Sequence, residues 1–291
     1  MLILTRKKMD MRTELEKKAK EHYFQMSDNT NVKVLEFNLA KKPDEYILFY
    51  IPGFGTVFQS WHESIEHLSK EFKIYYFESR EKASSIMPNK KTERNITLHK
   101  MAYDIKGVIE QLELDEKNYV TICSSTGGTI EIEALSEKWL NPKGAIMVGP
   151  TVEYHVRVIV AIFISLVPEF MKKMVMPIVR WYLGKVYVNK KENPEQFIKY
   201  MRAVEEMKVR KIRKPILQMV KYKCWHMLPK IQTKCLIIGE SGDKMHVDEE
   251  TIRTSKLIPN AEYINLGSNK AAHSLPLVNT VKDFIKKLKK G

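Results

Sequence analysis

Residues 120–129 read VTICSSTGGT, an apolar, β-branched run that stops abruptly at hydroxyl residues and two glycines. The run predicts a buried strand, and the residues after it predict the start of a helix. A sharp strand–turn–helix corner that holds a serine outward is the setting of the nucleophile elbow, G-x-S-x-G. With Ser125 at the centre, Gly127 stands two residues after it, and Cys123, which is still small, stands two residues before it.

A tight turn is the simpler interpretation of these residues, because small residues often follow a strand without any catalytic role. Ser124 is the alternative centre, but it would put Thr126 two residues later, where the elbow is crowded. A serine hydroxyl is a poor nucleophile unless a neighbouring base takes its proton, and that base needs a partner of its own. The interpretation of Ser125 therefore depends on the rest of the chain.

Two later loops supply the residue types that such a serine needs. Asp243 lies in CLIIGESGDKMH, and His273 lies in GSNKAAHSLP after the next predicted strand. Ser125, Asp243 and His273 thus each follow a predicted strand, and the carboxyl ends of parallel strands share one edge of a sheet. We predict that the three form a catalytic triad, with Asp248 as the replacement if Asp243 proves dispensable.

The fourth element of acyl transfer is a pair of N–H groups that bind the developing oxyanion. The amide of Thr126, directly after the serine at a helix N-terminus, is one predicted donor. The other is the amide of Phe54, in the loop IPGFGT at residues 51–56, where paired glycines let the backbone approach a ligand. A dinucleotide-binding interpretation of Gly53-x-Gly55 fails, because Phe58 stands where the third glycine should be.

Short apolar runs alternate with helical patterns through most of the chain, which indicates a mostly parallel sheet covered on both faces. The predicted strands are 32–39, 46–51, 73–77, 119–123, 145–148, 235–238 and 261–266. Helical patterns connecting or closing them cover 58–70, 98–114, 126–138 and 277–288. The alternation is interrupted after residue 149 by four further helical patterns, at 156–167, 169–183, 194–213 and 215–227.

This interruption predicts that residues 1–149 and 229–291 form the two parts of one core, with an inserted helical cap at 150–228. An insertion of this length between two strands is usually a functional lid. The alternative is an extra layer that only adds stability. We favour a lid, because the segments on both sides of the insertion contain the candidate catalytic residues.

Composition narrows the class of protein. The chain has 291 residues, 44% of them hydrophobic, and a net charge of +14. The lysines are spread out and no nucleic-acid module is visible, so we expect no nucleic-acid partner. A solvated helix face is favoured over a membrane contact for the basic segment 208–214. The longest apolar stretch, 158–167, is too short to span a bilayer, so we expect a cytoplasmic protein whose three cysteines are buried thiols.

The IPGFG loop, the CSSTGG elbow, the GESGD loop and the NKAAHSLP loop together resemble the α/β-hydrolase superfamily, in that family's order. The resemblance runs from about residue 32 to residue 290. It implies an α/β fold with a mostly parallel eight-stranded sheet flanked by helices and a helical cap inserted after the sixth strand. Pro52, Cys123 and the segment Glu78-Ser79-Arg80 depart from the family's commonest residues. Serine at the elbow is unlike the dehalogenase and epoxide-hydrolase branches, which use aspartate.

These features predict a serine hydrolase that cleaves a carboxylic ester with an apolar acyl group through an acyl-enzyme, without a metal or cofactor. An acyltransferase or thioesterase with the same triad, and a non-catalytic binding protein of this fold, remain alternatives. The expected partner is a small acyl ester, and the oligomeric state stays open. Met and aromatic residues of the cap are usually core but would suit an acyl pocket. They are Phe163, Phe170, Met171, Met174, Met176, Trp181, Met201 and Met207.

Overall fold

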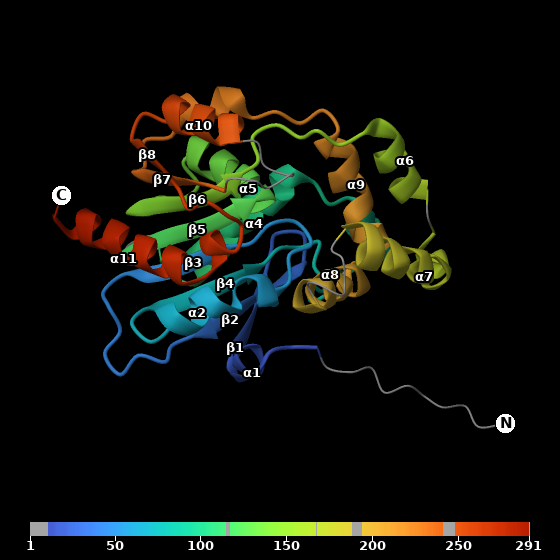
Figure 1. The fold of residues 1–291 in the computed structure, drawn as a ribbon, viewed down its shortest axis with the longest axis horizontal. Helices are drawn as coiled ribbons and strands as arrows, with labels where there is room; N and C mark the ends of the chain where they lie inside the picture. The colour runs from blue at the N-terminus through green and yellow to red at the C-terminus, as the bar shows by residue number, and fades with distance from the viewer. Residues whose placement is uncertain (1–10, 115–116, 167, 188–193, 241–247, 291) are drawn as a thin grey trace.

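The computed structural model describes residues 11–114, 117–166, 168–187, 194–240 and 248–290, and its centre is an eight-stranded sheet (Figure 1). The strand order is β1-β2-β4-β3-β5-β6-β7-β8. β2 is antiparallel to β1 and β4, and all later neighbours are parallel. The strands are β1 (Lys20–Gln25), β2 (Asn31–Phe37), β3 (Ile47–Ile51), β4 (Lys73–Glu78), β5 (Tyr119–Ser125), β6 (Gly144–Pro150), β7 (Cys235–Gly239) and β8 (Ala261–Asn265).

Helices cover both faces of this sheet. Outside the segment between β6 and β7, they are α1 (Glu14–Lys18), η1 (Phe58–Ser60), α2 (His62–Leu68), α3 (Lys90–Arg94), α4 (Leu98–Gln111), α5 (Thr126–Ser136), α10 (Asp248–Leu257), η5 (Ala271–His273) and α11 (Leu275–Lys290). The predicted fold class, a mostly parallel sheet between two helical layers, is therefore confirmed.

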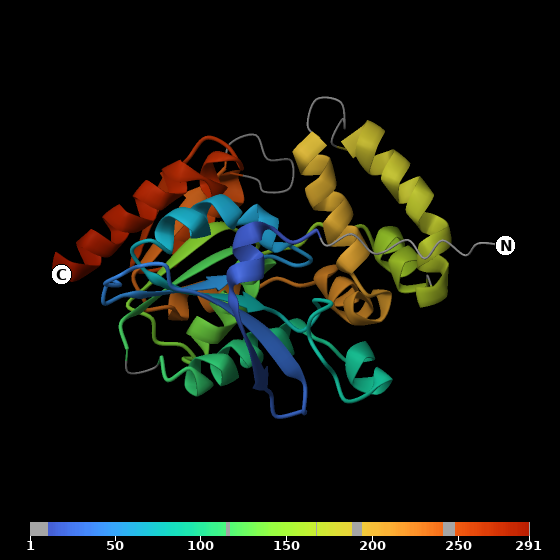
Figure 2. The ribbon, with the colours of Figure 1, turned by 90° about the horizontal axis from the view of Figure 1, so that it is seen from below.

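The strands are apolar on both sides because both faces of the sheet are buried. In β5, Tyr119 and Cys123 pack in the cluster that contains α4 and α5, while Val120 and Ile122 pack in the cluster that contains α2 and α11. Figure 2 shows α2 and α11 on one side of the sheet and α4 on the other. This alternation of side chains along β5 fixes the direction in which its last residue, Ser125, leaves the sheet.

One strand and three helices were missing from the sequence prediction. β1 (KEHYFQ) is an edge strand whose side chains alternate between exposed and half-buried, so it has no apolar run to reveal it. It is held by antiparallel pairing with β2, from Lys20 opposite Glu36 to Gln25 opposite Asn31. α1, α3 and α10 are short or strongly charged, and their helical pattern is correspondingly weak.

Between β6 and β7 the chain leaves the sheet and forms a group of helices, which we call the insertion. Its elements are α6 (Val158–Leu166), η2 (Glu169–Met171), α7 (Lys172–Tyr182), η3 (Leu183–Tyr187), α8 (Pro194–Glu206), α9 (Val209–Met219) and η4 (Trp225–Lys230). A bridge between Glu153 and Lys223, and a hydrogen bond from the Cys224 amide to the Val152 carbonyl at 2.9 Å, close its base. Figures 1 and 2 both show it to one side of the sheet.

The division of the last two helices of the insertion differs from the prediction. The break was expected at Pro215, but it falls at residues 207–208, and Pro215 lies inside α9. The chain tolerates this because the ammonium group of Lys211, one turn earlier, holds α9 against the core, bonding the Lys82 carbonyl at 2.7 Å and that of Ser85 at 2.8 Å. Tertiary contacts have overridden the local helix-breaking preference of proline.

Candidate active site

The candidate residues lie past the carboxyl ends of the parallel strands, as the sequence predicts. Ser125 ends β5, the loop 52–56 follows β3, and His273 lies in η5 after β8. The register pairs Ile51 with Cys123 and Val148 with Ile238, so these strands end at one edge. Asp243 lies outside the described residues, and Asp248 is the first residue of α10.

The backbone of Ser125 has the strained conformation of a nucleophile elbow. Its φ of 49° and ψ of −123° are rare for a residue with a side chain. A methyl group on Gly127 would lie only 2.0 Å from the carbonyl oxygen of Ile51, so glycine is needed there. Ser124, in contrast, is an ordinary strand residue, 7% exposed. The geometry therefore distinguishes Ser125 from Ser124 as the residue held at the corner.

The side chain of Ser125 meets a residue that the sequence did not single out. Its hydroxyl lies 3.4 Å from the hydroxyl of Thr151, directly after β6. The amide of Thr151 also donates to the carbonyl of Ser125 at 3.2 Å. Thr151 thus connects the turn at Ser125 to the neighbouring strand. The sequence alone does not show this contact, because it depends on the pairing of β5 with β6.

The loop after β3 packs directly beside the serine. A methyl group on Gly53 would lie 3.3 Å from the β-carbon of Ser125. The loop turns through a hydrogen bond from the Thr56 amide to the Gly53 carbonyl at 3.1 Å, and Gly55 has a φ of +65° that favours glycine. Phe54 stands in the middle of this turn, so its amide is placed on the loop expected to bind an oxyanion.

The loop is held in place by Lys82, which the sequence analysis did not single out. The Nζ of Lys82 donates to the carbonyls of Gly53 and Thr56, at 3.0 and 2.7 Å. The carboxylate of Glu81 accepts from the Gly55 amide at 3.4 Å. Lys82 thus binds two carbonyl oxygens of the loop and Glu81 binds one of its amides, and together they hold the loop beside Ser125.

His273 is half-buried in η5, and two contacts hold its ring. Its Nδ1 lies 2.9 Å from the carbonyl oxygen of Asn269, and its ring centre lies 4.5 Å from that of the buried Trp61. If Nδ1 carries a proton it donates to that carbonyl, which leaves Nε2 as the lone-pair nitrogen, the form that a general base requires.

The carboxylate of Glu240 lies beside His273. It directly follows β7, its side chain is 2% exposed, and its Oε1 is 3.9 Å from Nδ1 of His273. The side-chain amide of Asn269 donates to its other oxygen at 2.7 Å. The sequence could have indicated Glu240, because it is an acidic residue at the end of a predicted strand. The sequence analysis assigned the acid to Asp243, three residues later, instead.

The insertion reaches over this edge through α8. The methyl carbon of Met207, directly after α8, would lie 2.2 Å from a methyl group placed on Gly55. Burial lowers the pKa of Lys199 on α8, and the charge of Glu240 opposes that shift. Of the residues expected to face an acyl chain, Met207 therefore lies against the loop after β3.

Five of the other expected lining residues divide into two groups; Met171 is half-buried, and the side chain of Phe163 lies outside the described residues. Phe170, Met174 and Trp181 are exposed, by 76%, 71% and 57%. Met176 and Met201 pack in a cluster inside the insertion itself. The insertion thus leaves part of its apolar surface exposed to solvent.

The basic segment 208–214 is not the solvated helix face that its charge suggested. Lys211 is fully buried, and burial lowers its pKa to about 8, with the nearby charge of Lys208 adding to the shift. Arg210 pairs with Glu93 at 2.8 Å, and Lys214 donates to Asn95. Three of these basic side chains therefore bind the core of the protein.

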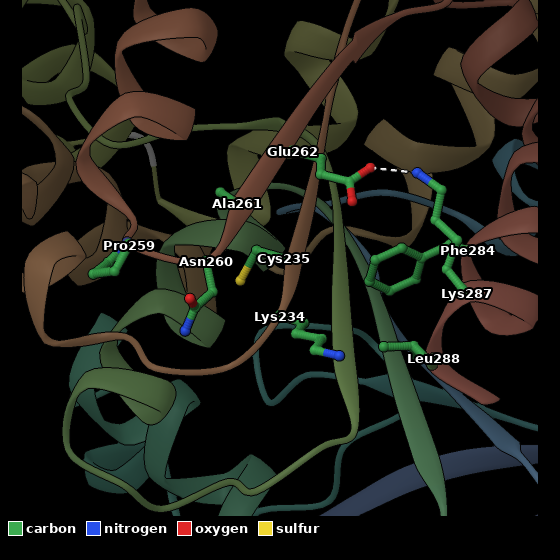
Figure 3. Close-up of a pocket in the computed structure, with 9 residues that line it drawn as sticks. All are labelled: Lys234, Cys235, Pro259, Asn260, Ala261, Glu262, Phe284, Lys287 and Leu288. Atoms are coloured by element: carbon green, nitrogen blue, oxygen red, sulfur yellow. Dashed lines mark hydrogen bonds and ion pairs between the residues drawn. The ribbon is translucent and has the colours of Figure 1, made fainter. Parts of the chain in front are cut away.

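A cavity of about 290 Å³ lies elsewhere, at the amino ends of β7 and β8. Figure 3 shows its lining, where Glu262 pairs with Lys287 across from Cys235 and Asn260. Because Ser125 ends β5 at the opposite edge, this cavity is separate from the candidate active site.

All three cysteines are free and buried, as predicted. Among the described residues, no cluster of three His, Cys, Asp or Glu could hold a metal ion.

Comparison with known proteins shows the fold. No protein-family model matches the sequence, and no curated protein matches it. An esterase from Exiguobacterium antarcticum has a TM-score of 0.72 and 16% identity, covering 93% of this chain and 100% of that one. A thermophilic esterase from Thermogutta terrifontis has a TM-score of 0.70 and 15% identity, covering 93% and 99%. An enol-lactonase from Burkholderia xenovorans LB400 has a TM-score of 0.70 and 14% identity, covering 93% and 100%.

These similarities extend over nearly the whole chain and agree with the strand order. The protein therefore has the fold of the α/β-hydrolase superfamily, with a helical insertion between β6 and β7.

Proposed function

We propose that the protein is a serine hydrolase that cleaves carboxylic esters with an apolar acyl group, with Ser125 as its nucleophile. The backbone of Ser125, at φ 49° and ψ −123° beside the Gly53 loop, is the observation that carries the proposal. Such a conformation costs on the order of 1–3 kcal/mol and persists where function requires it.

In the proposed reaction, Nε2 of His273 takes the proton of Ser125 as the serine oxygen attacks the ester carbonyl carbon. The amides of Phe54 and Thr126 bind the carbonyl oxygen as it becomes negative. The imidazolium then gives its proton to the leaving alcohol, and the acyl-enzyme remains. Water, deprotonated by the same histidine, releases the acid and restores Ser125.

Asp243 is the proposed acid that stabilises the imidazolium, on the strength of its place in the loop after β7. Glu240 adds a second negative charge near the same ring, with Oε1 3.9 Å from Nδ1. A buried carboxylate at this distance favours the charged imidazole that forms during attack.

Two observations support the proposed substrate class: the descriptions of solved proteins with a similar fold, and the contact of Met207 with Gly55. Solved proteins of similar fold are described as esterases and as an enol-lactonase, and both descriptions refer to the carbonyl of an ester bond. Met207 beside Gly55 offers an adaptable apolar wall next to the loop that would bind the oxyanion.

A fluorophosphonate label combined with a panel of p-nitrophenyl esters tests the proposal. Wild-type protein should be labelled, and Ser125→Ala should abolish labelling and lower kcat at least about 10³-fold. Ser124→Ala is the matched control and should retain both. Labelling that survives in Ser125→Ala would show that the nucleophile is another residue. Labelling without turnover of any ester would instead indicate a different acyl acceptor or a binding protein.

A further inference from the structure

The outer helices of the insertion carry an unusual number of exposed apolar side chains. The exposed fractions of Ile159, Leu166 and Phe170 are 76%, 72% and 76%. Six further side chains on the same elements are 47–71% exposed. These six are Val158, Ile162, Met174, Ile178, Trp181 and Tyr182.

Their spacing gathers them on one face of each helix. In α6, residues 158, 159, 162 and 166 follow the repeat of a helical face. Residues 170, 174, 178, 181 and 182 do the same along η2 and α7. We call these nine side chains the outer stripe. Figures 1 and 2 both show α6 and α7 on the side of the insertion away from the sheet, with α8 and α9 between.

The outer stripe lies in the most basic part of the chain. Residues 150–228 contain 16 Lys and Arg but six Asp and Glu, a net charge of +10 out of +14 for the whole protein. Arg157 and Lys185 are exposed beside the two helices that carry the stripe, and Arg180 on α7 is exposed although it lies 3.6 Å from Glu205. An apolar face bordered by positive charge is complementary to an anionic surface with an apolar interior.

We infer that the outer stripe docks onto the surface of an anionic phospholipid bilayer. The residue types support this occupant: aliphatic side chains would enter the acyl boundary, while Trp181 and Tyr182 suit the level of the headgroups. In the described part of the chain, no helix is long and apolar enough to cross a bilayer, so the contact is peripheral. A second copy of the chain fits less well, because a symmetric dimer through this face would bring the exposed Arg157 and Lys185 of two copies to one interface.

The inference does not depend on the proposed hydrolysis and can be tested without an activity assay. The probes are vesicles of pure phosphatidylcholine and vesicles of phosphatidylcholine with about 30% phosphatidylglycerol, separated from free protein by flotation. We expect the wild type to bind the anionic vesicles, and the bound fraction to fall as salt is raised, because charged headgroups attract the insertion through screened interactions.

Phe170→Ser with Ile178→Ser removes two members of the stripe. Both side chains are exposed, by 76% and 65%, so the fold should be retained, and circular dichroism checks it. Partitioning to anionic vesicles should fall on the order of tenfold, because each lost side chain removes apolar area from the lipid contact. The matched control is Leu39→Ser with Ile86→Ser. These two side chains lie outside the insertion and are 53% and 57% exposed, so the control should bind as wild type.

Three results would overturn the inference. The first is no binding of wild type to anionic vesicles at low salt. The second is equal loss of binding in the stripe variant and in the control. The third is a concentration-dependent dimer in sedimentation, absent in the stripe variant, together with no vesicle binding, which would assign the stripe to a second copy of the chain.

Discussion

The sheet with its helices and the insertion bury their residues by different means. Around the sheet, two large apolar clusters enclose the apolar side chains of the six inner strands. In the described part of the insertion, Leu183, Phe197 and Met201 form a small separate cluster, while Met219 and Leu228 at its base join a cluster of the core. Apolar burial is non-directional, so a small cluster inside the insertion does not by itself fix how α8 lies against the core. The difference indicates that other contacts orient α8.

Buried charged side chains supply those contacts. Arg202 on α8 donates to both carboxylate oxygens of Glu16 on α1, at 2.8 and 2.6 Å. Lys211 on α9 is held by the carbonyls of Lys82 and Ser85. Such groups add little net stability because their desolvation is costly, but breaking one leaves a buried charge without its partner. We conclude that apolar packing stabilises the core and the base of the insertion, whereas α8 is attached to the core through a buried ion pair.

The largest expected effect comes from breaking the packing of the core. Gly127→Ala would place a methyl group 2.0 Å from the backbone oxygen of Ile51, where no flexible side chain can yield. We expect a loss of more than about 4 kcal/mol in the free energy of unfolding, or failure to fold, measured by urea denaturation.

Gly107→Ala in α4 is the matched control. Its methyl group would lie 3.3 Å from the sulfur of Met26, a side chain that can move. Because alanine favours a helix over glycine, this variant should change stability by less than about 1 kcal/mol. Equal stability of the two variants would mean that the backbone around Gly127 can move to make room for a methyl group, and the prediction would be wrong.

A smaller effect is expected from breaking the charged attachment of the insertion. Arg202→Met should cost about 3 kcal/mol, since Glu16 would be left buried without its cation. The loss should appear in the insertion first, as faster hydrogen exchange of α8 amides at unchanged exchange in β5.

Two variants sharpen this result. Glu16→Gln combined with Arg202→Met removes both charges and should recover at least half of the lost stability. Lys289→Met breaks an exposed pair with Asp44 on the core and should cost less than about 1 kcal/mol. If Arg202→Met cost no more than Lys289→Met, charge would not be what positions the insertion.

The same contrast explains what the sequence could predict. Seven strands of the sheet have apolar runs, so their positions follow from pattern alone, and the elbow at Ser125 follows from its small neighbours. β1 lacked an apolar run because it is an edge strand, paired with β2 and exposed on alternate residues. Propensity misled at Pro215, where contacts of Lys211 keep α9 continuous.

The supports of the site were beyond sequence reasoning for a different reason. Thr151 and Lys82 reach their partners across strands and loops, and Trp61 meets His273 from more than two hundred residues away along the chain. Their residue types are common, and nothing in their local patterns marks them. Only the register of the sheet brings them to the same edge.

The smallest expected effect concerns a buried carboxyl of the core. Glu131 in α5 is fully buried, beside the side chains of Cys123 and Thr121. Burial raises its pKa to about 7, although Cys123 and Thr121 partly oppose the shift. The core therefore accepts this carboxyl in its neutral form, whereas Arg202 of the insertion is buried as a charge paired with Glu16.

This difference predicts a pH dependence with a definite sign. A carboxyl whose pKa is raised on folding contributes stability that is complete below its unfolded value near 4.5 and is lost as pH rises through about 7. Glu131→Gln stays neutral, so above pH 8 it should be more stable than wild type by roughly 2–3 kcal/mol, and the advantage should vanish near pH 4.5. Urea denaturation from pH 4 to 9 measures this, with the exposed Glu137→Gln, directly after the same helix, as the control. Parallel stability curves for wild type and Glu131→Gln would show that the surroundings of the buried carboxyl compensate its charge after all.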